Sequence, residues 1–79
     1  MSNNELTSFL RGKIEEIAFA KVEDNDELLD SGILDSVNVV ELSVEIENGL
    51  KIKIPFEEIN KDNFNSINAI CAYITKLRS

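Results

Sequence analysis

The sequence contains no histidine, one cysteine and three glycines among its 79 residues. Without histidine, the chain cannot form a Ser–His or Cys–His nucleophilic pair. Cys71 has no second cysteine with which to form an internal disulfide, and its apolar neighbours at helical spacing favour a place in the core. There is no glycine-rich phosphate-binding loop, and no residue cluster has the ligand spacing of a zinc site. We therefore expect neither a bound metal nor catalysis by this chain alone.

Long apolar runs are also missing. No stretch approaches the roughly 20 residues that a transmembrane helix needs, and charged residues interrupt the N-terminal segment where a signal peptide would have its apolar core. We expect a cytoplasmic protein that does not insert into membranes.

Basic residues are also few. Eight bases against fifteen acids give the chain a formal net charge of −7. This charge disfavours nucleic acid and favours a partner with a basic docking surface.

The remaining composition, 43% hydrophobic and 29% charged, is typical of a soluble globular protein, and the length predicts a single domain over residues 1–79. Apolar spacing predicts a helix from Asn3 or Asn4 to about Ala20 and a second from Ser36 to Asn48 or Leu50. A last helix is expected after a cap at residue 65 or 66. Pro55 favours a short helical segment, and "KIKI" at 51–54, which lacks a pairing strand, predicts an extended connector that buries residues 52 and 54. The prediction is an all-α bundle of three main helices plus one short helix.

Residues 21–35 are predicted to form a long acidic loop held by a few apolar side chains, Leu28, Leu29, Ile33 and Leu34. A loop of this length in a compact domain is often functional. Its acids suggest an EF-hand. Counted from Asp24, however, leucines stand where the calcium loop needs a ligand and a glycine. Calcium binding by that motif is therefore excluded.

The helix expected after residue 35 has two apolar stripes. One is a regular core stripe at helical spacing, made of Val39, Leu42, Ile46 and Leu50. The other is flanked by carboxylates and consists of Val37, Val40 and Val44, with Glu41 and Glu47 beside them. An apolar stripe with a charged rim is typical of a partner-binding surface. In so small a bundle it is equally typical of a helix packed between two others, and the spacing alone favours neither.

Ser36 stands at the start of this helix. Its hydroxyl suits an N-cap, which contributes about 1 kcal/mol. It equally suits an attachment point, because a phosphate joined to it would lie at the positive end of the helix dipole. Asp35 would then offer a carboxylate to a metal-dependent transferase. The Asp-Ser pair alone does not decide between the two.

Several segments in order carry a resemblance to a known family. They are "GILDSV" followed by "VVELSVEIEN", then "IKIPFEEI", Asn63–Phe64 and "SINAICAYITKL". Over nearly its whole length the chain resembles carrier proteins of the acyl, peptidyl or D-alanyl kind, which implies a small four-helix bundle and a monomer. In this family 4′-phosphopantetheine from coenzyme A esterifies a serine, which Ser36 matches, and Val37 replaces the usual leucine. The arm's thiol holds cargo as a thioester, so the protein is a carrier and not an enzyme.

The resemblance also implies how partners recognise the chain. The second helix is the recognition helix, and the contact positions map to Asp35, Val37, Val40, Glu41, Val44 and Glu47. Val40 is expected at the entrance of a cavity that shelters cargo. The implied partners are a phosphopantetheinyl transferase, a ligase or acyltransferase that loads the arm, and a downstream synthase or transferase. Docking is expected to be weak, electrostatically steered and salt-sensitive.

The interpretation is a stand-alone acyl or aminoacyl carrier of a specialised pathway, because "SGILDS" is more similar to D-alanyl, peptidyl or specialised carriers than to general fatty-acid carriers. A general fatty-acid acyl carrier is the alternative within the family. An unmodified helical interaction module, with Ser36 only as a cap, is the alternative from another class.

Two features depart from the family pattern. Asn38 and Asn48 replace acids of many fatty-acid carriers, which dilutes the charge of the recognition helix. Where the family often has Phe-Gly at the end of that helix, this chain has Leu50 and Lys51, with a glycine earlier at Gly49. We therefore predict either that the helix ends at Gly49 or that Lys51 is strained.

Overall fold

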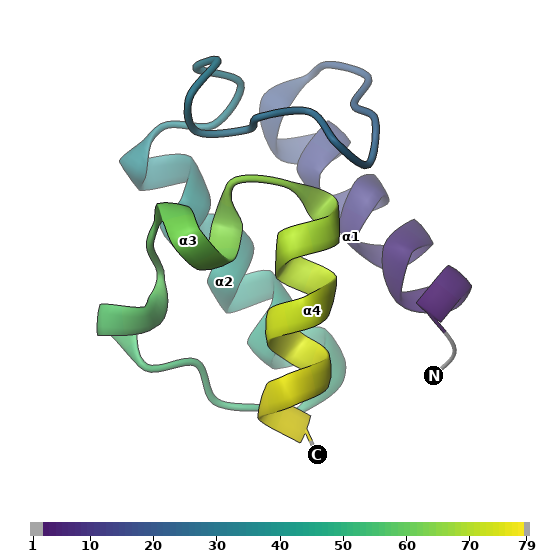
Figure 1. Cartoon of the computed structure of the whole chain (residues 1–79), viewed down its shortest axis with the longest axis vertical. Helices are drawn as coiled ribbons and strands as arrows, with labels where there is room; N and C mark the ends of the chain where they lie inside the picture. Colours follow the sequence, from purple (N-terminus) through teal and green to yellow (C-terminus); the bar gives the residue numbers. More distant parts are fainter. Residues whose placement is uncertain (1–2, 79) are drawn as a thin grey trace.

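A computed structural model describes residues 3–78 as a helical bundle (Figure 1). The elements in chain order are α1 (Asn3–Ala18), α2 (Ser36–Leu50), the 3₁₀ helix η1 (Phe56–Glu58), α3 (Lys61–Phe64) and α4 (Ile67–Arg78). Helix α1 contacts both α2 and α4, and α3 packs against α4. No strand occurs within this range, so the predicted all-α bundle with a long first loop is confirmed. None of its helices combines the length and hydrophobicity needed to cross a bilayer.

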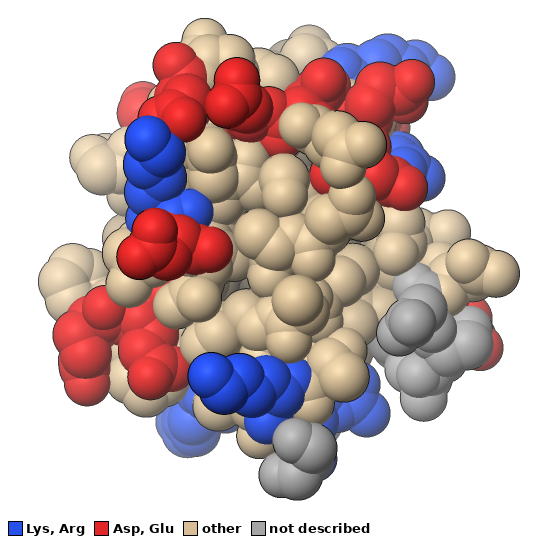
Figure 2. All heavy atoms as spheres, viewed as in Figure 1, with Lys and Arg blue, Asp and Glu red and all other residues tan. Residues whose placement is uncertain are grey.

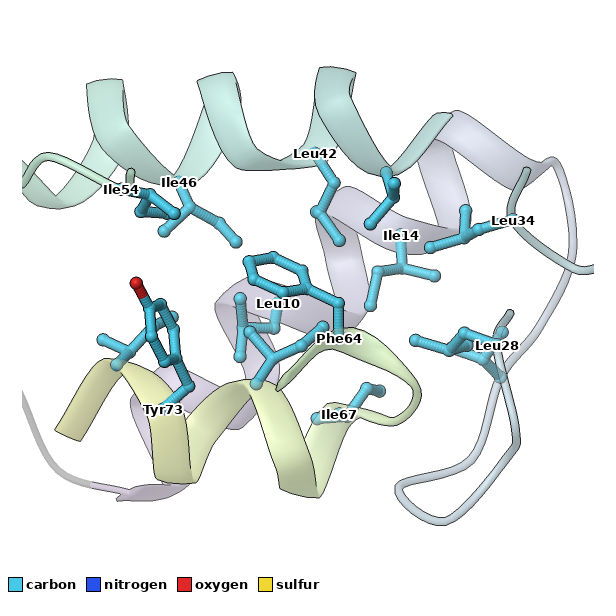
Figure 3. Close-up of a cluster of buried hydrophobic side chains, with 14 of the residues drawn as sticks. Leu10, Ile14, Leu28, Leu34, Leu42, Ile46, Ile54, Phe64, Ile67 and Tyr73 are labelled. Atoms are coloured by element: carbon cyan, nitrogen blue, oxygen red, sulfur yellow. The ribbon is translucent and has the colours of Figure 1, made fainter. Parts of the chain in front are cut away.

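The core lies between the three long helices, and Phe64 of α3 fills its centre (Figure 3). Its ring is fully buried and meets the ring of Tyr73 at 5.8 Å between centroids. Helix α1 contributes apolar residues at helical spacing, Leu6, Leu10 and Ile14. The predicted core stripe of α2 is confirmed, since Val39, Leu42 and Ile46 are buried and Leu50 packs against them.

The loop between α1 and α2 is tied to the far end of the chain. Its side chains Leu28 and Leu34 are buried, as predicted. The Leu28 N–H donates to the carbonyl oxygen of Asn65 at 2.7 Å, and the Asn65 side-chain oxygen accepts the N–H groups of Leu29 at 2.9 Å and Asp30 at 3.1 Å. Figure 1 shows this loop crossing the top of the bundle to reach α2. The α3–α4 junction thus anchors residues 28–30 of the loop that leads to α2.

The first two helices both end in a left-handed residue that is not glycine. Helix α1 ends at Ala18, two residues before the predicted end, and Phe19 follows with φ 55°. Helix α2 continues through Leu50, and Lys51 has φ 59° and ψ 46°. The predicted strain at Lys51 is therefore confirmed. The helix does not end early at Gly49, which has a packing role instead, since a Cβ there would lie 2.5 Å from Cζ of Phe9 in α1.

Short capped segments complete the chain after α2. The connector is extended, with Ile54 buried and Ile52 partly buried, as expected. Pro55 precedes η1, so it lies at the N-cap position and not inside the helical turn. Two short segments, η1 and α3, stand where the sequence indicated one. Ser66 caps α4, because its Oγ accepts the Ala69 N–H at 3.0 Å.

Candidate functional site

Helix α2 begins with a capping box made by Asp35 and Asn38. Asp35 has the extended backbone of an N-cap residue, with φ −101° and ψ −176°. Its Oδ1 accepts the Asn38 N–H at 2.8 Å, and the Asn38 Oδ1 accepts the Asp35 N–H at 3.3 Å. Two otherwise unpaired backbone donors are satisfied in this way. The N-cap role considered for Ser36 is therefore wrong, because the residue before it fills that role.

Ser36 is the first residue of α2 and is exposed. Within residues 3–78 its hydroxyl has no hydrogen-bond partner, so nothing in the described fold depends on this oxygen. A phosphate ester on Oγ would lie at the positive end of the dipole of a 15-residue helix. The position therefore fits a phosphate-linked group on both steric and electrostatic grounds.

The second apolar stripe of α2 faces solvent. The side chains of Val37, Val40 and Val44 are 67%, 38% and 46% exposed. They lie along an open surface hollow of about 600 Å³, here called the α2 hollow, lined by Ser36, Val37, Val40, Glu41, Val44, Glu45 and Phe56. This result excludes the interpretation of the valine stripe as buried core. The hollow runs from the exposed serine along the helix, which suits an apolar chain or a partner's side chains.

The acids predicted for recognition have different surroundings. Glu41 is exposed and lines the α2 hollow. Glu47 is only partly exposed, and its Oε2 accepts the Ile54 N–H at 2.7 Å, so it fixes the connector after α2. Glu45, which was not among the predicted contacts, also lines the hollow and pairs with Lys13 of α1 at 3.2 Å. Asp35 and Glu47 thus have intramolecular roles, and neither lines the hollow.

Phe56 is a lining residue that sequence reasoning missed. It is 74% exposed at the start of η1 and is the lining residue that comes from outside α2. The one available signal was its position directly after Pro55 and before two glutamates, in a segment too short to bury a large ring. Acidic side chains gather over η1 and over the long loop in Figure 2. The apolar lining therefore has acidic neighbours.

No metal centre accompanies this surface in the described part of the chain, where no three His, Cys, Asp or Glu side chains are grouped as ligands. What the surface offers is an unengaged hydroxyl at a helix N-terminus beside an apolar hollow. The family described as "Phosphopantetheine attachment site" matches residues 8–74. The chain belongs to this family of carrier proteins.

Three curated relatives agree with this assignment. The D-alanyl carrier proteins of Streptococcus sanguinis (strain SK36) and Streptococcus mutans serotype c are each 41% identical to the carrier over 68 residues. That of Streptococcus gordonii is 40% identical over the same length. Each alignment covers 84% of this chain and 86% of the relative. The resemblance read from the ordered segments is therefore confirmed.

Family membership defines what the carrier does. It tethers cargo on a covalently attached 4′-phosphopantetheine arm and does not itself catalyse a reaction. The arm supplies a thiol that holds the cargo as a thioester. The described surface fits such an arm. The Ser36 hydroxyl lies at the positive end of the α2 dipole, and the apolar hollow extends from it along the helix.

Proposed function

We propose that the arm is attached to Ser36 and that the carrier holds an aminoacyl cargo, D-alanine. The observation that carries the attachment site is the capping box, because Asp35 and Asn38 complete the helix end without the serine hydroxyl. Attachment is a phosphoryl transfer: the Ser36 oxygen attacks the pantetheine-linked phosphate of coenzyme A, and adenosine 3′,5′-bisphosphate leaves. The hydroxyl proton passes to a base of the phosphopantetheinyl transferase.

Asp35 has a second use in this proposal. One of its oxygens accepts the Asn38 N–H, and its side chain is exposed next to the serine. The other oxygen is directed to the transferase, where it helps hold the magnesium ion that carries coenzyme A. The cap bond holds the carboxylate in one orientation, so that this oxygen is already positioned when the enzyme docks.

The α2 hollow is the docking surface that we propose for the carrier's partners. These are the phosphopantetheinyl transferase, the ligase that loads the arm and the downstream transferase that takes the cargo. Val37, Val40 and Val44 give the apolar centre and Glu41 the charge at its edge. Glu47 acts indirectly, by holding the connector that carries Phe56 toward α2. A small apolar centre with few charges suits the weak, reversible contacts of a shuttle.

D-alanine is favoured over a fatty acyl chain by the three D-alanyl carrier relatives. The charge of α2 agrees with this choice. Asn38 stands where many fatty-acid carriers have an acid and is used for the capping box, while Glu45 is paired within the chain. Because coenzyme A and ATP are cytoplasmic metabolites, the proposal places the carrier in the cytoplasm.

Intact mass after incubation with coenzyme A, magnesium and a broad-specificity phosphopantetheinyl transferase tests the attachment site. We expect a gain of one phosphopantetheine that Ser36→Ala abolishes. Ser31→Ala is the matched control, because Ser31 is also exposed and lies five residues earlier in the loop. A gain retained by a folded Ser36→Ala protein would place the arm elsewhere.

Loading tests the cargo. The modified carrier is incubated with ATP, D-alanine and a D-alanine-activating ligase, and in parallel with a fatty acid and an acyl ligase. We expect a D-alanyl thioester that hydroxylamine removes. Fatty-acyl loading alone would refute the proposed cargo and favour the general acyl carrier.

A further inference from the structure

A second hollow lies on the other side of α2, where the end of α1 meets it. This α1–α2 hollow measures about 440 Å³ and is lined by Lys13, Glu16, Ile17, Phe19, Asn38, Glu41 and Glu45. It shares Glu41 and Glu45 with the α2 hollow, so the two adjoin across the exposed face of the helix. A protein that covers α2 to reach Ser36 would cover both.

Phe19 is the most exposed large apolar side chain of the described chain, at 93%. Its backbone is in the left-handed region, where a bulky residue is a genuine outlier. Its N–H donates to the Glu15 carbonyl oxygen at 2.9 Å, so the position acts as the C-terminal stop of α1. Glycine would serve that stop without strain. Ending helix α1 does not require an aromatic side chain, and the exposed ring adds nothing to the core. Neither role therefore explains the phenylalanine at the rim of this hollow.

The charge of the α1–α2 hollow indicates which kind of partner group would contact the Phe19 ring. Three glutamates and one lysine line it, and Lys13 is paired with Glu45 at 3.2 Å. Glu16 and Glu41 have no ion pair among the described residues, which leaves two formal negative charges beside an exposed aromatic face. A guanidinium group meets both features, because its flat face stacks on an aromatic ring while its edge donates to carboxylates.

We propose that the α1–α2 hollow receives an arginine side chain of the ligase that loads the arm, stacked on Phe19 and bonded to Glu16 and Glu41. This rests on the proposed function, since it names the contact by which the D-alanine ligase recognises the carrier. A second copy of the chain fits the hollow poorly, because each copy has a formal net charge of −7. Ser36 does not line this hollow, so an arginine bound there anchors the ligase beside α2 without occupying the position of the proposed arm.

Steady-state loading of the modified carrier by the D-alanine-activating ligase of the same organism tests the contact. Phe19→Asn removes the ring and keeps a residue that tolerates the left-handed backbone. We expect it to raise KM about tenfold with kcat unchanged, as the loss of a desolvated cation–aromatic contact predicts. Phe19→Tyr retains the aromatic face and should stay near the wild-type KM.

The charge is tested separately. Glu16→Gln should raise KM several-fold and weaken the dependence of KM on salt. Asp62→Asn is its matched control, because it removes one charge from an exposed residue of α3, outside both hollows, and should leave KM unchanged. Circular dichroism confirms that each variant is folded.

Several outcomes would overturn the proposal. Loading of Phe19→Asn with a wild-type KM would refute the contact while the proposed cargo stands. A ligase that fails to load the wild-type carrier would refute the cargo, and this contact with it. Sedimentation showing a wild-type dimer that Phe19→Asn dissociates would make a second copy the occupant of the hollow.

Discussion

The division of roles between Asp35 and Ser36 gives the sharpest test of the structure. Asp35→Ala removes the bond to the Asn38 N–H, which is worth about 1 kcal/mol at an N-cap. It also removes a negative charge from the helix N-terminus, worth roughly 0.3–1 kcal/mol. The expected loss is therefore about 1.5 kcal/mol of unfolding free energy. Ser36→Ala should change this free energy by less than about 0.5 kcal/mol, because the hydroxyl has no partner among the described residues.

Thermal and urea unfolding followed by circular dichroism measure both changes. In a domain of this size, 1 kcal/mol shifts Tm by about 4–8 °C, so the loss expected for Asp35→Ala is readily resolved. Asp35→Asn separates the two contributions, because asparagine caps as well as aspartate but carries no charge. It should lose only the charge contribution. If Ser36→Ala destabilised the protein as much as Asp35→Ala, the serine would be the cap in solution and the reasoning would fail.

Two further predictions concern backbone strain and titration. Lys51→Gly should raise the unfolding free energy by about 1 kcal/mol relative to Lys51→Ala in urea denaturation, because glycine relieves the left-handed φ of 59°; equal stability of the two variants would contradict strain. Burial, and then the hydrogen bond to Glu58, raise the pKa of Tyr73 to about 12, from an ordinary 10.0. Because the folded pKa is the higher one, the neutral hydroxyl stabilises the fold fully below pH 10, and this contribution is lost as pH rises from about 10 to 12. Tyr73→Phe should therefore unfold with a shallower pH dependence in that window, and an unchanged alkaline profile would contradict it.

The sequence predicts the helices well where their apolar spacing is long. The three long helices and their buried stripes follow from periodicity, since only one face of each helix can pack against the others. The long loop was also predictable, because residues 21–35 are rich in acids and lack helical apolar spacing. Its few leucines stand out as the side chains that hold it to the core. Helix α3 has only four residues, which is too short for apolar spacing to indicate a helix. It is held by the Asn60 cap and by the burial of Phe64.

The details of the site were harder to predict for physical reasons. Aspartate and serine are about equally good N-caps, so only the backbone, extended at Asp35 and helical from Ser36, decides between them. Glu47 reads as a surface acid until the connector turns back and presents the Ile54 N–H to it. The two exposed phenylalanines contradict the rule that aromatic residues are buried, and only the tertiary structure shows that the core is complete without them.

The anchors of the long loop have a consequence for the order in which the protein is made. The backbone and side chain of Asn65 hold residues 28–30, and the Asn68 N–H donates to the Asp24 carbonyl oxygen at 3.2 Å. All of these partners come from the last quarter of the chain. A growing polypeptide on the ribosome that has passed Ser36 but not yet reached Asn65 lacks every one of them. The loop that leads to Ser36 therefore gains these anchors only when synthesis is nearly complete. Under the proposed attachment at Ser36, a transferase that needs the anchored loop would modify finished molecules and not fragments.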